Sequence, residues 1–77
     1  MTYTVICKMD CGWCDKALNL LHEEYKDYQY YYIEGDKFIV TLLKMSGMTT
    51  LPQVFSPTGE HIGGYKELKE YLDNEQV

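Results

Sequence analysis

The spacing of apolar and polar residues predicts alternating strands and helices in the first half of the chain. Residues 2–7 are rich in β-branched and aromatic side chains and predict a strand. A helical spacing follows over residues 12–25, and Asp10 is placed to cap this helix. The apolar residues predicted to face inward on this helix are Cys14, Ala17, Leu18, Leu21 and Tyr25.

The middle of the chain predicts a second strand and a second helix. Residues 28–33 are rich in tyrosine, which favours a strand. Asp36 is placed to cap a helix that ends at Gly47. The residues predicted to face inward on it are Phe38, Ile39, Leu42, Leu43 and Met45.

The last third predicts a hairpin and a final helix. Strands at residues 52–56 and 60–62 flank the turn Pro57-Thr58-Gly59. The pair Gly63-Gly64 ends the hairpin, and a helix over residues 65–73 turns Leu68 and Leu72 inward. The order β-α-β-α-β-β-α predicts an α/β fold whose four-stranded mixed sheet carries helices on both faces. The first two strands are expected to be parallel and the last two antiparallel.

Length and composition restrict the class of protein. With 77 residues the chain is expected to form one domain, residues 1–77. The net charge is −5 and arginine is absent, which argues against nucleic-acid binding. No run approaches the roughly 20 apolar residues of a membrane span, and no signal peptide is evident. Three cysteines are too few for a secreted disulfide scaffold, so we expect the reducing cytoplasm as the compartment. We also expect a monomer.

The motif Cys11-Gly12-Trp13-Cys14 carries the predicted chemistry. A Cys-x-x-Cys pair between a strand and a helix is typical of a thioredoxin-like redox motif. A helix N-terminus stabilises a thiolate, and Lys8 adds positive potential, so Cys11 is the expected nucleophile and Cys14 the resolving thiol.

Other interpretations of the cysteines stay open. The pair could be two unrelated cysteines on an ordinary helix. It could also provide half of a zinc site, but a second ligand pair is missing, since Cys7, His22 and His61 lie far apart in sequence. Cys7 itself ends an apolar strand and is expected to be a small buried hydrophobe.

Two further segments suggest binding rather than packing alone. Pro52 opens a predicted strand, where proline is sterically acceptable. Gly63-Gly64 before a helix can present backbone N–H groups to a carboxylate, although a plain tight turn explains the pair equally well. The run Tyr30-Tyr31-Tyr32 is expected to pack on the sheet rather than to form a stacking surface.

Together these segments make the chain similar to the glutaredoxins, which have the thioredoxin fold, and in particular to the small glutaredoxins of tailed bacteriophages. The similarity covers nearly the whole chain. It rests on three motifs in the same order: Lys8 with Cys11-Gly12-Trp13-Cys14, then Thr50-Leu51-Pro52-Gln53-Val54-Phe55, then Gly63-Gly64-Tyr65.

The resemblance implies a glutathione- and substrate-binding surface around the cysteines. In the family, the counterpart of Pro52 is cis and faces the cysteine pair, and the backbone of Leu51 pairs with a bound peptide or glutathione. Lys8 matches a residue that holds the glycine carboxylate of glutathione, while Gly64 and Tyr65 match the turn that receives its γ-glutamyl carboxylate. Trp13 and Thr50 complete the implied surface.

Two positions depart from the family pattern. The usual Cys-Pro-Tyr-Cys is replaced by Cys11-Gly12-Trp13-Cys14, whose glycine is also found in thioredoxin and in glutaredoxins that hold an iron–sulfur cluster. Lys66 stands at one position where the family often has an acid for the amine of glutathione, which leaves Glu67 for that role.

The expected activity is glutathione-linked dithiol–disulfide exchange through Cys11 and Cys14. The expected partners are glutathione as reductant and protein disulfide clients, among them ribonucleotide reductase, as the resemblance implies. Three alternatives remain: a glutathione-ligated [2Fe–2S] carrier, a thioredoxin-like carrier reduced by a flavoprotein reductase, and a redox-inert interaction module. A phage-encoded chain would work in the host cytoplasm.

Overall fold

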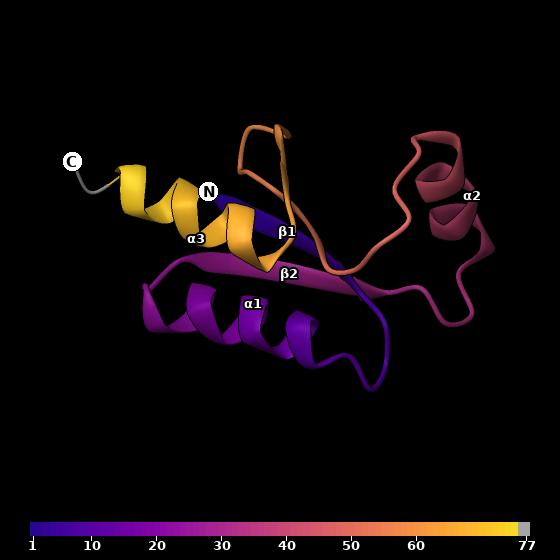
Figure 1. The fold of residues 1–77 in the computed structure, drawn as a ribbon, viewed down its shortest axis with the longest axis horizontal. Helices are drawn as coiled ribbons and strands as arrows, with labels where there is room; N and C mark the ends of the chain where they lie inside the picture. Colours follow the sequence, from indigo (N-terminus) through magenta and orange to yellow (C-terminus); the bar gives the residue numbers. More distant parts are fainter. Residues whose placement is uncertain (76–77) are drawn as a thin grey trace.

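The seven predicted elements all form, in the predicted order (Figure 1). The structure is a computed structural model that describes residues 1–75. The elements are β1 (Thr2–Cys7), α1 (Gly12–Glu23), β2 (Asp27–Tyr32), α2 (Lys37–Met45), β3 (Gln53–Phe55), β4 (His61–Gly63) and α3 (Tyr65–Glu75). Most observed boundaries lie within two residues of the predicted ones.

One mixed sheet with the strand order β2-β1-β3-β4 forms the centre of the molecule. β1 pairs in parallel with β2, so that Cys7 lies opposite Tyr32, and β3 runs antiparallel to both β1 and β4. The expected parallel crossover and antiparallel hairpin are therefore confirmed. β1 is one of the two inner strands, and the chain continues from its carboxyl end into the loop before the cysteine motif.

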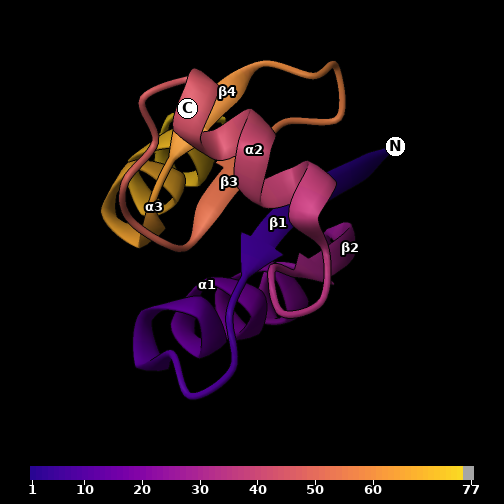
Figure 2. The ribbon, with the colours of Figure 1, turned by 90° about the vertical axis from the view of Figure 1, so that its right-hand side faces the viewer.

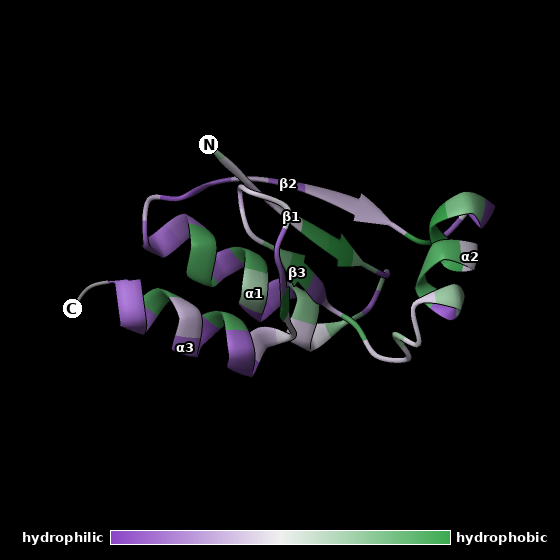
Figure 3. Ribbon diagram, turned by 90° about the horizontal axis from the view of Figure 1, so that it is seen from above, coloured by the Kyte–Doolittle hydropathy of each residue, from purple (hydrophilic) through white to green (hydrophobic). Residues whose placement is uncertain are grey.

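Helices α1 and α3 lie next to each other and cover one face of the sheet (Figure 3). Alternate residues of β1 contribute to the core beneath them, because successive strand side chains point to opposite faces. The fully buried core side chains include Val5, Leu21, Val54, Leu68 and Leu72. The inward orientation predicted for Leu68 and Leu72 is thus confirmed. None of the helices within residues 1–75 is long and apolar enough to cross a membrane.

Helix α2 does not form a second helical layer (Figures 2 and 3). Asp36 caps it as predicted, its Oδ1 accepting the Ile39 N–H at 3.0 Å. No Cα atom of α2, however, comes within 8 Å of one in another helix or strand. The expectation of helices on both faces is therefore corrected: α2 stands beyond the end of the sheet, at the carboxyl end of β1.

The predicted inward face of α2 is accordingly wrong at three positions. Phe38, Leu42 and Met45 are 72%, 46% and 79% exposed, while Ile39 and Leu43 are half-buried. The helical spacing was identified correctly, but spacing alone does not say whether an apolar face has a partner. Here the loops at both ends carry the helix away from the sheet.

The end of α1 also differs from the prediction. The helix stops at Glu23, and the chain turns at Tyr25, which has a left-handed φ of +57° and is 95% exposed. The Lys26 N–H then closes the turn on the Leu21 carbonyl at 2.9 Å. Tyr25 is therefore not part of the inward face, whereas Cys14, Ala17 and Leu21 are.

The tyrosines of β2 lie on an edge strand. Tyr30, Tyr31 and Tyr32 are 45–49% exposed, and the rings of Tyr30 and Tyr32 meet edge to face at 5.7 Å. They pack along the sheet as expected, but each leaves about half of its surface open.

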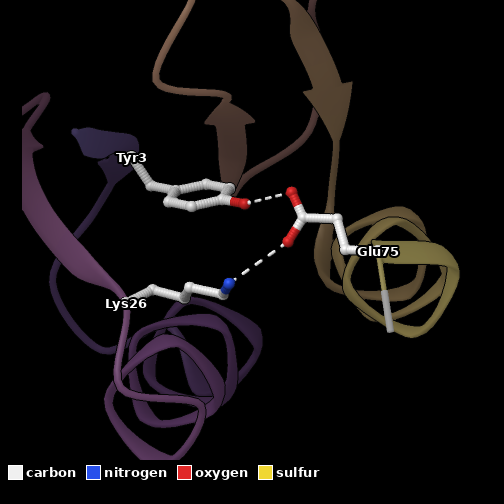
Figure 4. Close-up of polar contacts among 3 residues, drawn as sticks. All are labelled: Tyr3, Lys26 and Glu75. Atoms are coloured by element: carbon white, nitrogen blue, oxygen red, sulfur yellow. Dashed lines mark hydrogen bonds and ion pairs between the residues drawn. The ribbon is translucent and has the colours of Figure 1, made fainter. Parts of the chain in front are cut away.

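A polar contact joins the two ends of the described chain (Figure 4), and the end of α3 lies at the opposite end of the molecule from the start of α1 (Figure 1). The Tyr3 hydroxyl donates to Glu75 Oε1 at 2.9 Å, and Lys26 Nζ lies 3.3 Å from Glu75 Oε2. One carboxylate thereby fastens the end of α3 to β1 and to the loop before β2.

Candidate active site

Cys11 and Cys14 are joined by a disulfide at the N-terminus of α1, with their Cα atoms 5.2 Å apart. Cys11 itself is the N-cap, and its Sγ accepts the Cys14 N–H at 3.2 Å. The prediction that Asp10 caps this helix is wrong: Asp10 adopts a left-handed φ of +54° and turns the chain into the motif. The nucleophilic sulfur therefore occupies the position where the helix presents its unpaired N–H groups.

The two cysteines differ in access to solvent. Cys11 is 7% exposed and Cys14 is 1% exposed. A Cβ placed on Gly12 would meet no atom within 4 Å, so the space beside Cys11 is open to an approaching chain. This asymmetry suits an attacking Cys11 and a resolving Cys14.

The loop before β3 faces the disulfide. The Leu51–Pro52 peptide bond is cis, and the Leu51 carbonyl oxygen lies 4.0 Å from Cys11 Sγ. Pro52 is buried, Leu51 is half-buried and Thr50 is exposed. The structure therefore brings the predicted backbone-pairing residue next to the predicted nucleophile.

A buried amide that the sequence analysis did not identify holds this loop. Gln53 is 6% exposed and donates from Nε2 to the Thr50 carbonyl at 2.8 Å. Its Oε1 lies 2.6 Å from His61 Nε2 on β4. The only sequence indication was a polar residue inside a short apolar strand. Gln53 and His61 position the loop that carries Leu51.

Aromatic residues form one wall beside the cysteines. Trp13 is 59% exposed, and its ring lies 5.9 Å from that of Tyr65 at the start of α3. Lys16 Nζ lies 4.6 Å from the centre of the Trp13 ring, a cation–π contact that the sequence analysis missed. Trp13 and Tyr65, both predicted site residues, are thus brought together.

The glycine turn lies on the same side of the molecule. Gly63 has a φ of +128°, a conformation that favours glycine, and a Cβ on Gly64 would lie 3.6 Å from the Pro52 carbonyl oxygen. The Gly64 N–H donates to Glu67 Oε1 at 2.8 Å. Gly64, Tyr65 and Glu67 therefore adjoin the loop of Leu51 and Pro52.

Lys8 is the predicted site residue with the weakest connection to the others. It is exposed in the loop between β1 and α1, and no contact links its side chain to the disulfide. The same loop is held by Glu34, whose carboxylate accepts the Met9 N–H at 3.1 and 3.2 Å. This acid, which follows β2, was also missed.

A largely apolar cleft of about 400 Å³ opens between α2 and the loop of Leu51. Val40 and Leu43 line it from α2, and residues 48–51 line it from the loop. Lys44 is the one charged residue among the described residues that line it. The cleft therefore adjoins the backbone that contacts Cys11.

The third cysteine lies outside this chemistry. Cys7 is fully buried, as predicted, and burial together with the charge of Asp15 raises the pKa of its thiol to about 11. It therefore stays a protonated thiol at neutral pH, and the redox pair is Cys11 and Cys14.

The donor set of the described residues does not fit a metal ion. Within residues 1–75, no three side chains of His, Cys, Asp or Glu are grouped so as to hold one. The arrangement instead matches disulfide exchange: one sulfur at a helix N-terminus beside open space, a second sulfur that is more deeply buried, and the Leu51 carbonyl next to the first sulfur.

Comparison with known proteins agrees with this geometry. The Glutaredoxin family profile matches residues 3–62. The glutaredoxin of Enterobacteria phage T4 is 35% identical, over 80% of this chain and 84% of that protein. The hybrid peroxiredoxin hyPrx5 of Haemophilus influenzae is 38% identical over 90% of this chain, which spans only 28% of that longer protein.

A solved structure extends the likeness to three dimensions. The crystal structure of a buckwheat glutaredoxin–glutathione complex superposes with a TM-score of 0.79 at 27% identity, over 95% of this chain and 69% of that one. The expected thioredoxin-like fold is thereby confirmed. With the family profile matched over most of its length and a redox-active cysteine pair in place, this chain belongs to the glutaredoxin family of thiol–disulfide oxidoreductases.

Proposed function

We propose that this chain is a glutathione-linked reductant of protein disulfides and of glutathione mixed disulfides. The observation that carries the proposal is the disulfide between Cys11, on the N-terminus of α1, and the buried Cys14, with the Leu51 carbonyl beside it. The described state is then the oxidised form that ends one catalytic cycle.

The cycle has two exchanges. The Cys11 thiolate attacks one sulfur of the client disulfide, forms a mixed disulfide and releases the other client sulfur as a thiolate that takes up a proton. The Cys14 thiolate then attacks Cys11 Sγ, which releases the second client thiolate and forms the Cys11–Cys14 disulfide. Two glutathione molecules reduce this disulfide and leave as glutathione disulfide.

Glutathione binding is proposed for the surface that the site residues form. Its cysteine backbone would pair with Leu51 beside Pro52 and Thr50, and its γ-glutamyl end would reach Gly64 and Tyr65. Lys8 would attract the glycine carboxylate, and Trp13 would cover the cysteine end. The glutathione complex of the buckwheat relative supports this proposal.

Protein clients are proposed to use the cleft between α2 and the loop. Residues that flank a client cysteine bonded to Cys11 would lie along Leu51 and reach Val40 and Leu43. The hybrid peroxiredoxin relative, which contains a segment like this one, favours peroxide-oxidised proteins as one client class. Ribonucleotide reductase is a second client to test, in the cytoplasm of a cell or of a phage host.

An iron–sulfur cluster receives no such support. Among the described cysteines, Cys11 is the least buried at 7% exposed, and no three metal-ligating side chains of residues 1–75 are grouped, so a cluster would need ligands from glutathione and a second chain.

The roles of the two cysteines are tested by Cys11→Ser and Cys14→Ser. Cys11→Ser should abolish all disulfide reduction, because it removes the attacking thiolate. Cys14→Ser should keep the removal of glutathione from mixed disulfides, which needs one protein thiol, but lose the dithiol route to protein disulfides. A Cys14→Ser variant that reduces protein disulfides at the wild-type rate without glutathione would contradict these roles.

The electron donor is tested with the wild-type protein. Turnover of a protein disulfide is measured once with glutathione and glutathione reductase, and once with thioredoxin reductase. Turnover only with thioredoxin reductase would show that this reductase, and not glutathione, is the electron donor. The proposed roles of the two cysteines would not change.

A further inference from the structure

The carboxylate of Glu67 lies over the glycine turn beside the active site. Its Oε1 accepts the Gly64 N–H at 2.8 Å. A Cβ on Gly63 would lie 2.9 Å from Glu67 Cγ, and one on Gly64 would lie 3.3 Å from Glu67 Oε1. The Glu67 side chain therefore fills the space directly above both glycines.

This contact is electrostatically favourable for the free protein. Gly64 precedes the first residue of α3, and its carbonyl accepts the Leu68 N–H at 2.9 Å, so Gly64 acts as the N-cap. A glutamate three residues after an N-cap commonly bonds back to the N-cap N–H. The positive end of the helix dipole adds to the attraction. The turn is thus a carboxylate-binding position that already holds a carboxylate of the same chain.

The turn is also close to the reacting sulfur. A Cβ on Gly64 would lie 3.6 Å from the Pro52 carbonyl oxygen, and the preceding carbonyl, that of Leu51, lies 4.0 Å from Cys11 Sγ. A thiol compound that is bonded to Cys11 and lies along Leu51 and Pro52 would therefore have one of its ends at this turn. If that end is a carboxylate, it meets Glu67.

We propose that Glu67 determines specificity by competing, as an internal carboxylate, with ligand carboxylates for the Gly64 N–H. This inference rests on the proposed function. A disulfide with a carboxylate at that place, such as glutathione disulfide, must displace the Glu67 side chain from the Gly64 N–H. Its carboxylate is then repelled by the nearby carboxylate of Glu67. A disulfide without one reacts while Glu67 stays in place. The chain thereby disfavours glutathione disulfide relative to carboxylate-free disulfides.

The test measures one ratio in single-turnover reactions. The reduced protein is mixed with glutathione disulfide or with hydroxyethyl disulfide, which has no carboxylate, and the second-order rate constants are read from Trp13 fluorescence. Glu67→Ala should raise the ratio of the glutathione rate constant to the hydroxyethyl rate constant by about two- to five-fold, the usual size of one charge at a helix N-terminus.

Glu70→Ala is the matched control. Glu70 is exposed on the same helix, and its replacement removes the same charge without touching the turn. Removing any acidic residue makes the protein less repulsive to an anionic disulfide. Glu70→Ala measures this general effect of net charge on the ratio. The ratio should rise clearly more in Glu67→Ala than in Glu70→Ala.

Equal ratios in the two variants would overturn the proposal. A lower ratio in Glu67→Ala would also overturn it and would instead assign Glu67 to the amine of glutathione. Absence of reaction with both disulfides in the wild-type protein would overturn the proposed function itself. If Glu67→Ala does not fold, Glu67→Gln keeps the capping acceptor without the charge, and its ratio must still exceed that of Glu70→Ala.

Discussion

At the scale of single residues, the environment decides which sulfur reacts. Cys11 follows the left-handed turn at Asp10 and caps a helix, next to open space at Gly12. Cys7, only four residues earlier, lies inside the core, where its thiol is held in the neutral form. The same side chain is thus a reagent in one position and a packing element in the other.

This contrast predicts selective alkylation of the reduced protein. Cys7 should resist iodoacetamide up to about pH 10, because its pKa is raised to about 11 and its sulfur is buried. Cys11 should be alkylated at neutral pH. Mass spectrometry of the digested protein measures both, and denaturant should expose all three cysteines as a control. Equal labelling of Cys7 and Cys11 in the folded protein at pH 8 would contradict the prediction.

The buried amide of Gln53 leads to a second prediction. Gln53→Leu should lower the free energy of unfolding by about 1 kcal/mol, because the Thr50 carbonyl and His61 lose their partner. It should also lower kcat/KM, since the loop that carries Leu51 becomes less fixed. Chemical denaturation and a disulfide-reduction assay measure the two effects.

Gln29→Leu is the matched control for this substitution. Gln29 is exposed on β2 and bonds to Thr4 at the surface. Its replacement should leave kcat/KM at the wild-type value. An equal loss of activity in both variants would show that Gln53 has no special role in positioning the loop.

At the scale of elements, α2 and α3 show what an amphipathic spacing does and does not reveal. Both have apolar residues at helical spacing. In α3, Leu68 and Leu72 are buried under the sheet, whereas in α2, Phe38 and Met45 face solvent. The paths of the loops and the size of the sheet decide what an apolar helical face packs against. The sequence of the helix itself contains neither piece of information.

This difference predicts opposite responses to substitution. Leu42→Lys, on the exposed side of α2, should change the free energy of unfolding by less than about 0.5 kcal/mol. Leu68→Ala should cost about 2–5 kcal/mol, because it opens a cavity in the core. Urea denaturation of both variants measures this. A loss of several kcal/mol in Leu42→Lys would mean that α2 packs on the sheet in solution.

The sequence predicts the secondary-structure elements better than the side-chain contacts between them. Strand composition, helical spacing and the glycine and proline positions predict all seven elements, whereas the expectation that Cys11, Leu51 and Gly64 lie together rests on the resemblance to glutaredoxins. The bond from Glu67 to Gly64 and the bridge from Gln53 to His61 escaped prediction, because each depends on a rotamer chosen in three dimensions. The N-cap at Cys11 was missed since Asp10 is the better capping residue by type, but it takes up a left-handed turn.

At the scale of the whole molecule, one contact holds the end of α3 against the start of β1. Glu75 of α3 accepts a hydrogen bond from Tyr3 of β1 and pairs with Lys26 (Figure 4). The ion pair is partly exposed on both sides and contributes little by itself. Tyr3 as a residue is only 3% exposed, so its hydrogen bond to Glu75 is less screened by solvent than the ion pair.

This contact predicts a loss of stability at alkaline pH. Burial, and then the neighbouring Glu75, raise the pKa of Tyr3 above its ordinary value near 10. The contribution of Tyr3 to stability is complete below about pH 10 and is lost as pH rises further, because the unfolded chain ionises more readily. Denaturation at pH 8 and pH 10.5 should show a smaller decrease for Tyr3→Phe than for the wild type. Tyr25→Phe, at a 95% exposed position, should behave like the wild type.

The hydrogen bond between Tyr3 and Glu75 affects how this domain can be linked to other domains. The start of β1 and the end of α3 meet at one pole, and the disulfide lies at the opposite pole, about 20 Å along β1. A domain attached at either end would leave Cys11 uncovered. A flexible linker would keep that domain close enough to reach Cys11. Linkage of this kind can raise the effective concentration of a client to the millimolar range. The architecture therefore allows a slow collision between two proteins to be replaced by an exchange within one chain.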